Sequence, residues 1–129
     1  MALALTRDLT DIDEVAASCY DVYERRGEVA DLMSWNRLFL GETVTEQPPT
    51  PTVVVRSTRT IECVLPHGID PAVYLTGFRR MVSEDWTVRV LVHSAEMGRA
   101  HARLRGSPVT IQTWWFDRGR VSFGRPEIP

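Results

Sequence analysis

The chain has 129 residues, of which 43% are hydrophobic, and this is enough for one domain whose core needs no metal or disulfide support. Its net charge of −2 argues against nucleic acid as the main partner, because phosphate binding requires a clustered basic surface. Cys19 and Cys63 lie far apart without a CxxC partner, and no apolar run reaches the roughly 18 residues that a membrane span requires.

The N-terminal third predicts two helices. The opening stretch MALALTR is too short and too soon followed by acidic residues to be a signal peptide, so we expect a soluble, cytoplasmic protein. Thr10 or Asp11 is expected to cap a first helix that ends at Gly27 and carries its apolar residues along one side. A second helix is expected over residues 28–40, stopped by Gly41.

The middle of the chain predicts a loop, one strand or a bent pair of strands, and a third helix. Residues 41–52 are polar and proline-rich, which is typical of a surface loop, and residues 53–65 carry the β-branched content of strands. Asp70 is expected to cap the third helix, with Pro71 at its first position. Gly77 in the middle of that helix predicts a close approach of another backbone.

The C-terminal third predicts four consecutive antiparallel strands, because apolar and polar residues alternate there with the period of a half-buried strand. In the second of these strands Ala100 and Ala102 are expected to face the helices. Pro126 is expected to end strand pairing, since proline donates no hydrogen bond to a ladder. The expected strands are residues 87–93, 100–105, 109–116 and 121–123.

This order of elements, ending on the hairpin WWFDRGRVSF, resembles the NTF2-like superfamily, which includes SnoaL-type polyketide cyclases and ketosteroid isomerases. The resemblance implies one α+β domain over residues 1–129, in which three helices cover the concave face of a curved antiparallel sheet and leave a conical pocket. Where the superfamily usually has a Phe-Ala-x-Asp segment, this chain has LFLGE at residues 38–42, so no catalytic aspartate is carried over. A strand, a helix and four strands is also the order of the hotdog fold of acyl-thioesterases and dehydratases, which is the alternative.

The candidate catalytic groups are general acids and bases. His93 and Glu96, three residues apart near a strand end, could relay a proton, and the hydroxyl of Tyr20 is suited to polarising a substrate carbonyl. Glu62 is a further candidate base, although an exposed position is the common one for glutamate. An exposed strand end and ordinary core packing are the structural alternatives for these groups and for the aromatic residues. The expected substrate-binding residues are Tyr23, Trp35, Asn36, Phe78 and Trp115.

The sequence leaves open whether the chain is an enzyme. The first hypothesis is a cofactor-free, metal-free isomerase, cyclase or dehydratase of secondary metabolism that acts on a polyketide-like or other hydrophobic metabolite. The alternatives are a non-catalytic ligand-binding or accessory module and a hotdog-type acyl-thioester hydrolase or dehydratase. Trp114, Phe116 and Arg103 are expected on the outer face of the sheet, where aromatic residues beside arginine predict a homodimer interface.

Overall fold

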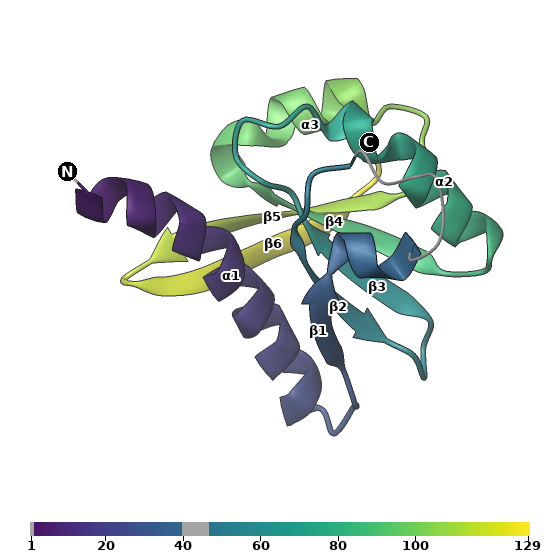
Figure 1. Ribbon diagram of the computed structural model, residues 1–129, viewed down its shortest axis with the longest axis horizontal. Coiled ribbons are helices and arrows are strands. Elements are labelled where there is room, and N and C mark those ends of the chain that lie inside the picture. Colours follow the sequence, from purple (N-terminus) through teal and green to yellow (C-terminus); the bar gives the residue numbers. More distant parts are fainter. Residues whose placement is uncertain (1, 40–46) are drawn as a thin grey trace.

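The computed structural model describes residues 2–39 and 47–129, with side chains described from residue 11 onward, and has an α+β fold as predicted (Figure 1). Its helices are α1 (Ala2–Arg25), α2 (Leu75–Ser83) and α3 (Met97–Arg103), with short 3-10 helices η1 (Trp35–Phe39), η2 (Pro71–Tyr74) and η3 (Ser94–Glu96). Its strands are β1 (Asp31–Ser34), β2 (Pro51–Val55), β3 (Thr60–Val64), β4 (Thr87–His93), β5 (Thr110–Asp117) and β6 (Arg120–Glu127). No helix in the described residues combines the length and the apolar character that crossing a membrane requires.

The six strands form one open, mixed sheet in which neighbours in sequence are neighbours in space. β1, β2 and β3 are antiparallel to one another, and β5 and β6 form an antiparallel hairpin. β3, β4 and β5 run parallel, because α2 connects the first two and α3 connects the next two. The prediction of four consecutive antiparallel strands at the C-terminus is therefore wrong.

The error concerns the segment that forms α3. Ala100, Ala102 and Leu104 fit a strand period, but Met97, Ala100 and Leu104 also fit one side of a helix. Residues 94–105 contain no β-branched residue, and alanine is the strongest helix former, so the helix is the better local choice. As the helix requires, Ala100 is fully buried whereas Ala102 is exposed.

The N-terminal region also differs from the prediction. α1 begins at Ala2, well before the expected cap, although its end next to Gly27 is as predicted. The predicted second helix is wrong, because this stretch forms the edge strand β1 and then η1. Pairing with β2 decides this, since β1 lies antiparallel to it and the Trp35 amide donates to the Thr50 carbonyl at 2.8 Å. The expected helix stop at Gly41 lies outside the described residues.

Other local predictions are confirmed. Residues 53–65 supply most of the paired strands β2 and β3, although β2 already begins at Pro51, inside the predicted loop. Asp70 caps η2 by accepting a hydrogen bond from the Ala72 amide at 3.0 Å, with Pro71 at the first helical position. The β5–β6 hairpin also forms, but β6 continues through Pro126. A proline is tolerated there because β6 pairs with only one neighbour in the described sheet.

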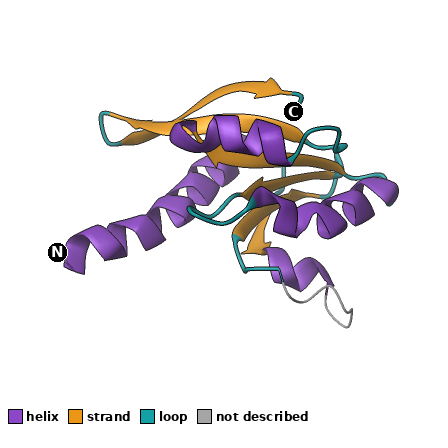
Figure 2. Ribbon diagram, turned by 90° about the horizontal axis from the view of Figure 1, so that it is seen from above, coloured by secondary structure: helices purple, strands orange, loops and turns teal. Residues whose placement is uncertain are grey.

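Helices cover both faces of the sheet (Figure 2), so the expectation that all of them pack on one concave face is wrong. We call the two sides the α2 face, covered by α2, α3 and η1, and the α1 face, covered by α1. Along β4 the side chains of Val88, Val90 and Val92 enter the α2 face, while Leu91 enters the α1 face. The strand period thus distributes the core between two layers.

The α2 face contains the close approach predicted at Gly77. A Cβ atom at this position would lie 2.6 Å from the Gln47 Oε1 atom and 2.9 Å from the Trp35 Cζ2 atom. The approaching groups are therefore side chains and not the backbone that was expected. Glycine at this point of α2 allows η1 and residue Gln47 to pack directly against the helix.

Candidate functional site

The α1 face contains a carboxylate at its centre. Glu62 lies in β3 between Ile61 and Cys63, whose side chains enter the α2 face, so the strand period directs Glu62 toward α1. Only 3% of Glu62 is exposed. The sequence-based expectation that Glu62 is an exposed charge is therefore wrong. A charge at this depth requires partners, because burial removes its hydration.

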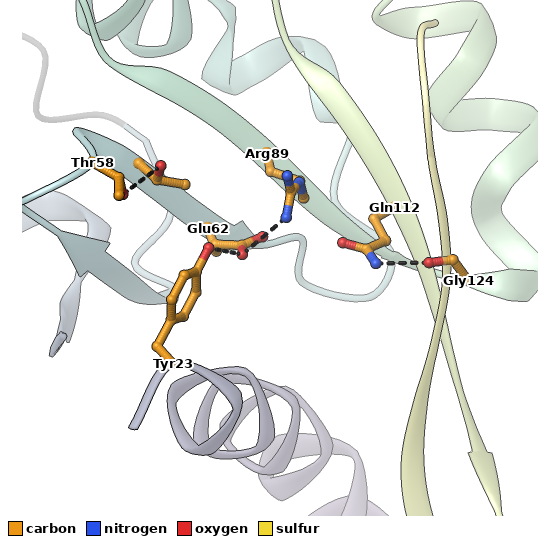
Figure 3. Close-up of polar contacts among 7 residues, drawn as sticks. Tyr23, Thr58, Glu62, Arg89, Gln112 and Gly124 are labelled. Carbon is orange, nitrogen blue, oxygen red and sulfur yellow. Dashed lines mark hydrogen bonds and ion pairs between the residues drawn. The ribbon is translucent and has the colours of Figure 1, made fainter. Parts of the chain in front are cut away.

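Two side chains from separate elements supply these partners (Figure 3). The hydroxyl of Tyr23, on α1, donates a hydrogen bond of 2.6 Å to Oε2 of Glu62. The Nη1 atom of Arg89 donates to the same oxygen at 3.2 Å. Arg89 reaches it because β3 and β4 are parallel neighbours in which Glu62 and Arg89 are paired positions. The helix, the first crossover and the parallel register together assemble this cluster.

Two polar atoms of the cluster are buried without a hydrogen-bond partner among the described residues. They are Oε1 of Glu62 and Nε of Arg89. A buried acceptor or donor left unsatisfied costs about 1–3 kcal/mol, and more when the group is charged. Buried side-chain atoms without a partner also occur elsewhere in the described residues, so what sets this cluster apart is that its two charged residues line a pocket.

The two atoms belong to residues that line a pocket between α1 and the sheet. The pocket has a volume of about 80 Å³, small beside the roughly 300–1,000 Å³ of sites for drug-sized ligands. It suits a ligand of few heavy atoms. The lining residues are Cys19, Val22, Tyr23, Arg26, Glu62, Arg89, Leu91, Gln112 and Phe123.

Burial and the charge of Glu62 set the protonation of the hydroxyl and thiol beside it. Burial raises the pKa of Tyr23, and the charge of Glu62 and the hydrogen bond to it raise this pKa further. Burial followed by the charge of Glu62 likewise raises the pKa of Cys19. Tyr23 therefore remains a hydrogen-bond donor at neutral pH, and Cys19 remains a thiol and not a nucleophilic thiolate.

His93 and Glu96, which were expected to relay a proton between them, each form a hydrogen bond with another group. His93 accepts a hydrogen bond from the Ala95 amide through Nδ1 at 3.1 Å. Glu96 instead accepts from the Gly68 amide at 3.1 Å, and its second oxygen lies 3.6 Å from Nδ1 of His67. His93 is the last residue of β4, and Glu96 ends η3, where it contacts the loop that follows β3; the catalytic roles of both residues remain predictions.

The tyrosine and aromatic candidates do not share one cavity. Tyr20 is bonded to Glu24 on its own helix, and the bond raises the pKa of the Tyr20 hydroxyl. Trp35 and Phe78 are fully buried in the apolar core of the α2 face, and Tyr23 lies on the α1 face. Asn36 is partly buried on η1, with an Oδ1 atom that has no hydrogen-bond partner among the described residues, and Trp115 is 36% exposed on β5. Of the predicted substrate-binding residues, Tyr23 alone lines the pocket beside Glu62.

The three residues expected to form a dimer face do not lie together. Trp114 is fully buried on the α1 face, where its ring contacts that of His93 at 4.7 Å between centroids. Phe116 is partly buried beside it, 5.6 Å away between ring centroids. Arg103 lies on α3, which packs on the other face, and is bonded to Asp70 at 2.8 Å. The predicted common surface is therefore wrong, while the homodimer itself remains a prediction.

Comparison with family models, with curated proteins and with solved structures found no match. The resemblance to the NTF2-like superfamily therefore remains a prediction. In the described part of the chain, no group of three or more histidine, cysteine, aspartate and glutamate side chains could hold a metal ion. The candidate site is therefore supported by the geometry of the described residues alone.

Sequence reasoning missed Arg89 and Gln112 as members of the site. The available signal was a single charge inside each of two apolar strands, Glu62 in TIECV and Arg89 in TVRVLVH. Two opposite charges in strands that are otherwise buried are expected to pair, because neither is tolerated alone. The pairing itself depended on a parallel register that the antiparallel interpretation excluded.

Proposed function

We propose that this chain is a small-molecule-binding domain whose ligand occupies the pocket between α1 and the sheet. The observation that carries the proposal is the pair of buried atoms, Oε1 of Glu62 and Nε of Arg89, that make no hydrogen bond among the described residues yet belong to residues lining one pocket. A ligand with complementary polar groups would lie against this charged pair, whose side chains form part of the pocket wall. This is the ligand-binding alternative among the functions considered from the sequence.

The surroundings of the pocket support the same proposal. Leu91 and Phe123 offer apolar wall for a carbon skeleton, and Tyr23 is held in place by its hydrogen bond to Glu62. Of the predicted NTF2-like architecture, the proposal uses a pocket between a helix and a sheet. Both cysteines are free and buried, which suits the reducing cytoplasm expected for the chain.

The test is to identify a bound molecule. We expect native mass spectrometry of the purified chain, or a thermal-shift screen of small polar metabolites, to find a ligand that binds the wild type. Binding should be lost in Glu62→Gln, which keeps the shape of the side chain, and kept in Asp21→Asn, an exposed change on α1 outside the pocket lining. A folded wild type that binds no member of the screen, with water alone in the pocket of its crystal structure, would refute the proposal.

The second candidate is the cofactor-free isomerase, cyclase or dehydratase expected from the sequence. The observation that favours it is a buried carboxylate beside a tyrosine hydroxyl, 2.6 Å apart, since such a pair can serve as base and hydrogen-bond donor in proton transfer. In this reaction Glu62 would take a proton from a substrate carbon and return it to another. Incubation with the identified ligand in deuterated water distinguishes the candidates, because deuterium enters carbon positions only if Glu62 exchanges that proton.

A further inference from the structure

The charges around the pocket indicate which ligand it accepts. Its lining contains two arginines, Arg26 and Arg89, and one acid, Glu62, so the lining carries one net positive charge. The same three groups are the charges that act on the Cys19 thiol in the pocket wall. Since the charge of Glu62 is balanced by Arg89, the charge of Arg26 is left for a ligand. A monoanion suits this balance better than a cation or a neutral molecule.

Arg26 is placed to receive such an anion. It follows the last residue of α1, and its guanidinium carbon lies 5.8 Å from the centre of the Tyr23 ring. The side chain is exposed, so it stands at the entrance to the pocket while Arg89 and Glu62 are deeper. A carboxylate between the guanidinium groups of Arg26 and Arg89, both of which line the pocket, would neutralise the remaining charge.

The pocket also presents hydrogen-bond acceptors, so a ligand that binds there needs a hydrogen-bond donor in addition to its carboxylate. Glu62 lines the pocket, and its carboxylate accepts hydrogen bonds but donates none. Gln112 donates from Nε2 to the Gly124 carbonyl at 2.7 Å, which leaves its Oε1 atom on the side of Arg89 and Glu62 (Figure 3). A hydroxyl group fits these acceptors, whereas an ammonium group would add a positive charge that the lining does not balance.

Resting on the function proposed above, we propose that the ligand is a small hydroxycarboxylate, with its carboxylate held by the two arginines and its hydroxyl donating to Glu62. The pocket volume of about 80 Å³ limits the carbon skeleton to a few atoms, packed against Val22, Leu91 and Phe123. Each part of this ligand corresponds to a group that the pocket presents: one net positive charge, buried acceptors and an apolar wall.

Isothermal titration calorimetry of the full chain with four matched probes tests the inference. The probes are lactate, propionate, which lacks the hydroxyl, lactamide, which lacks the charge, and alanine, which carries an ammonium group in place of the hydroxyl. We expect lactate to bind most tightly, with each of the other probes weaker by about tenfold or more, because each loses a charge-assisted hydrogen bond or the charge balance.

Two arginine variants supply the control. Arg26→Gln should weaken lactate binding by about tenfold while leaving lactamide binding unchanged, since only the carboxylate meets Arg26. Arg25→Gln, an equally exposed change at the preceding residue outside the pocket lining, should leave both unchanged. Equal weakening by both variants would overturn the inference, because it would show a general effect of surface charge.

The outcomes separate the ligand class from the function. If lactamide or alanine binds as tightly as lactate and Glu62→Gln abolishes this binding, the hydroxycarboxylate class is wrong while the binding function stands. If propionate equals lactate, the assignment of the hydroxyl to Glu62 is wrong. If no probe binds and a wider screen of amines, alcohols and amides also fails, both the class and the function proposed above are refuted.

Discussion

The two faces of the sheet are built from the same strands but contain different chemistry. The core of the α2 face is apolar and aromatic, and includes Trp35 and Phe78, whose ring centroids lie 5.4 Å apart. The α1 face has valine, leucine and tryptophan in its core but also contains Glu62 and Arg89 beside a pocket. The difference suits an α2 face that stabilises the fold and an α1 face in which buried charges carry an energetic cost beside the proposed binding site.

The largest effect is expected from truncating an aromatic side chain on the α2 face. Phe78 is fully buried, so Phe78→Ala should lower the free energy of unfolding by about 3–5 kcal/mol through lost burial and the cavity left behind. Phe123→Ala, at a partly buried residue of the pocket wall, should cost clearly less. Urea denaturation measures both. Equal losses in the free energy of unfolding would contradict the proposal that the α2 face contributes more to stability than the pocket wall.

A slightly smaller effect is expected from breaking the ion pair. Arg89→Leu leaves Glu62 buried without its cation and should cost about 2–4 kcal/mol, less than for a fully buried pair because the Arg89 side chain is 29% exposed. The double variant Glu62→Met with Arg89→Leu should recover most of this loss, since it removes both charges. Chemical denaturation of the three proteins tests the pair. A double variant less stable than Arg89→Leu would show that the pair itself stabilises the fold.

Removing the hydroxyl of each buried tyrosine compares how much one side-chain hydrogen bond stabilises each face. Tyr23→Phe removes a hydrogen bond to a carboxylate and should cost about 1.5–3 kcal/mol. Tyr74→Phe removes a bond of 2.9 Å to the neutral Pro48 carbonyl and should cost about 0.5–1.5 kcal/mol. Thermal or urea unfolding gives both values. A larger loss for Tyr74→Phe would argue against a charged Glu62 beside Tyr23.

The smallest effect concerns pH. Burial raises the pKa values of the Cys19 and Cys63 thiols, one on each face, so the unfolded chain releases protons that the folded chain keeps. Stability from these groups is fully present below the unfolded cysteine pKa and falls as pH rises through it, by about 1 kcal/mol in total at pH 8.5. Cys19→Ala and Cys63→Ala should each remove part of this slope in urea titrations between pH 7 and pH 9. Stability that stays constant over this range would contradict the predicted burial of the thiols.

Local signals in the sequence were sufficient for the elements that local chemistry determines. The cap at Asp70, the turn between β5 and β6, and the β-branched strands β4 and β5 follow from residues near one another in the chain. α3 was missed because alanines two apart fit both periods, and the absence of β-branched residues was the better guide. β1 could not be recognised locally, because its strand conformation depends on pairing with β2.

The candidate site was predicted only in part, because its residues meet through contacts between distant parts of the chain. Tyr23 and Glu62 were each recognised as candidates, but their contact joins residues 39 positions apart. Arg89 was missed because its partner lies across a parallel register that only the α2 crossover creates. Exposure is the ordinary state of a glutamate, so the burial of Glu62 follows from the placement of α1 and not from its neighbours in sequence.

The central claim is that Glu62 and Arg89 face a ligand across the pocket under α1. It is tested most directly by NMR observation of the Arg89 side-chain Nε–H signal during a titration of the isotope-labelled chain with lactate. This atom has no hydrogen-bond partner in the described structure, so we expect its signal to shift in a saturable manner together with signals from Tyr23 and Gln112, while those of α2 and α3 stay in place. An Arg89 signal that does not move at saturating lactate, or shifts confined to the α2 face, would contradict the account.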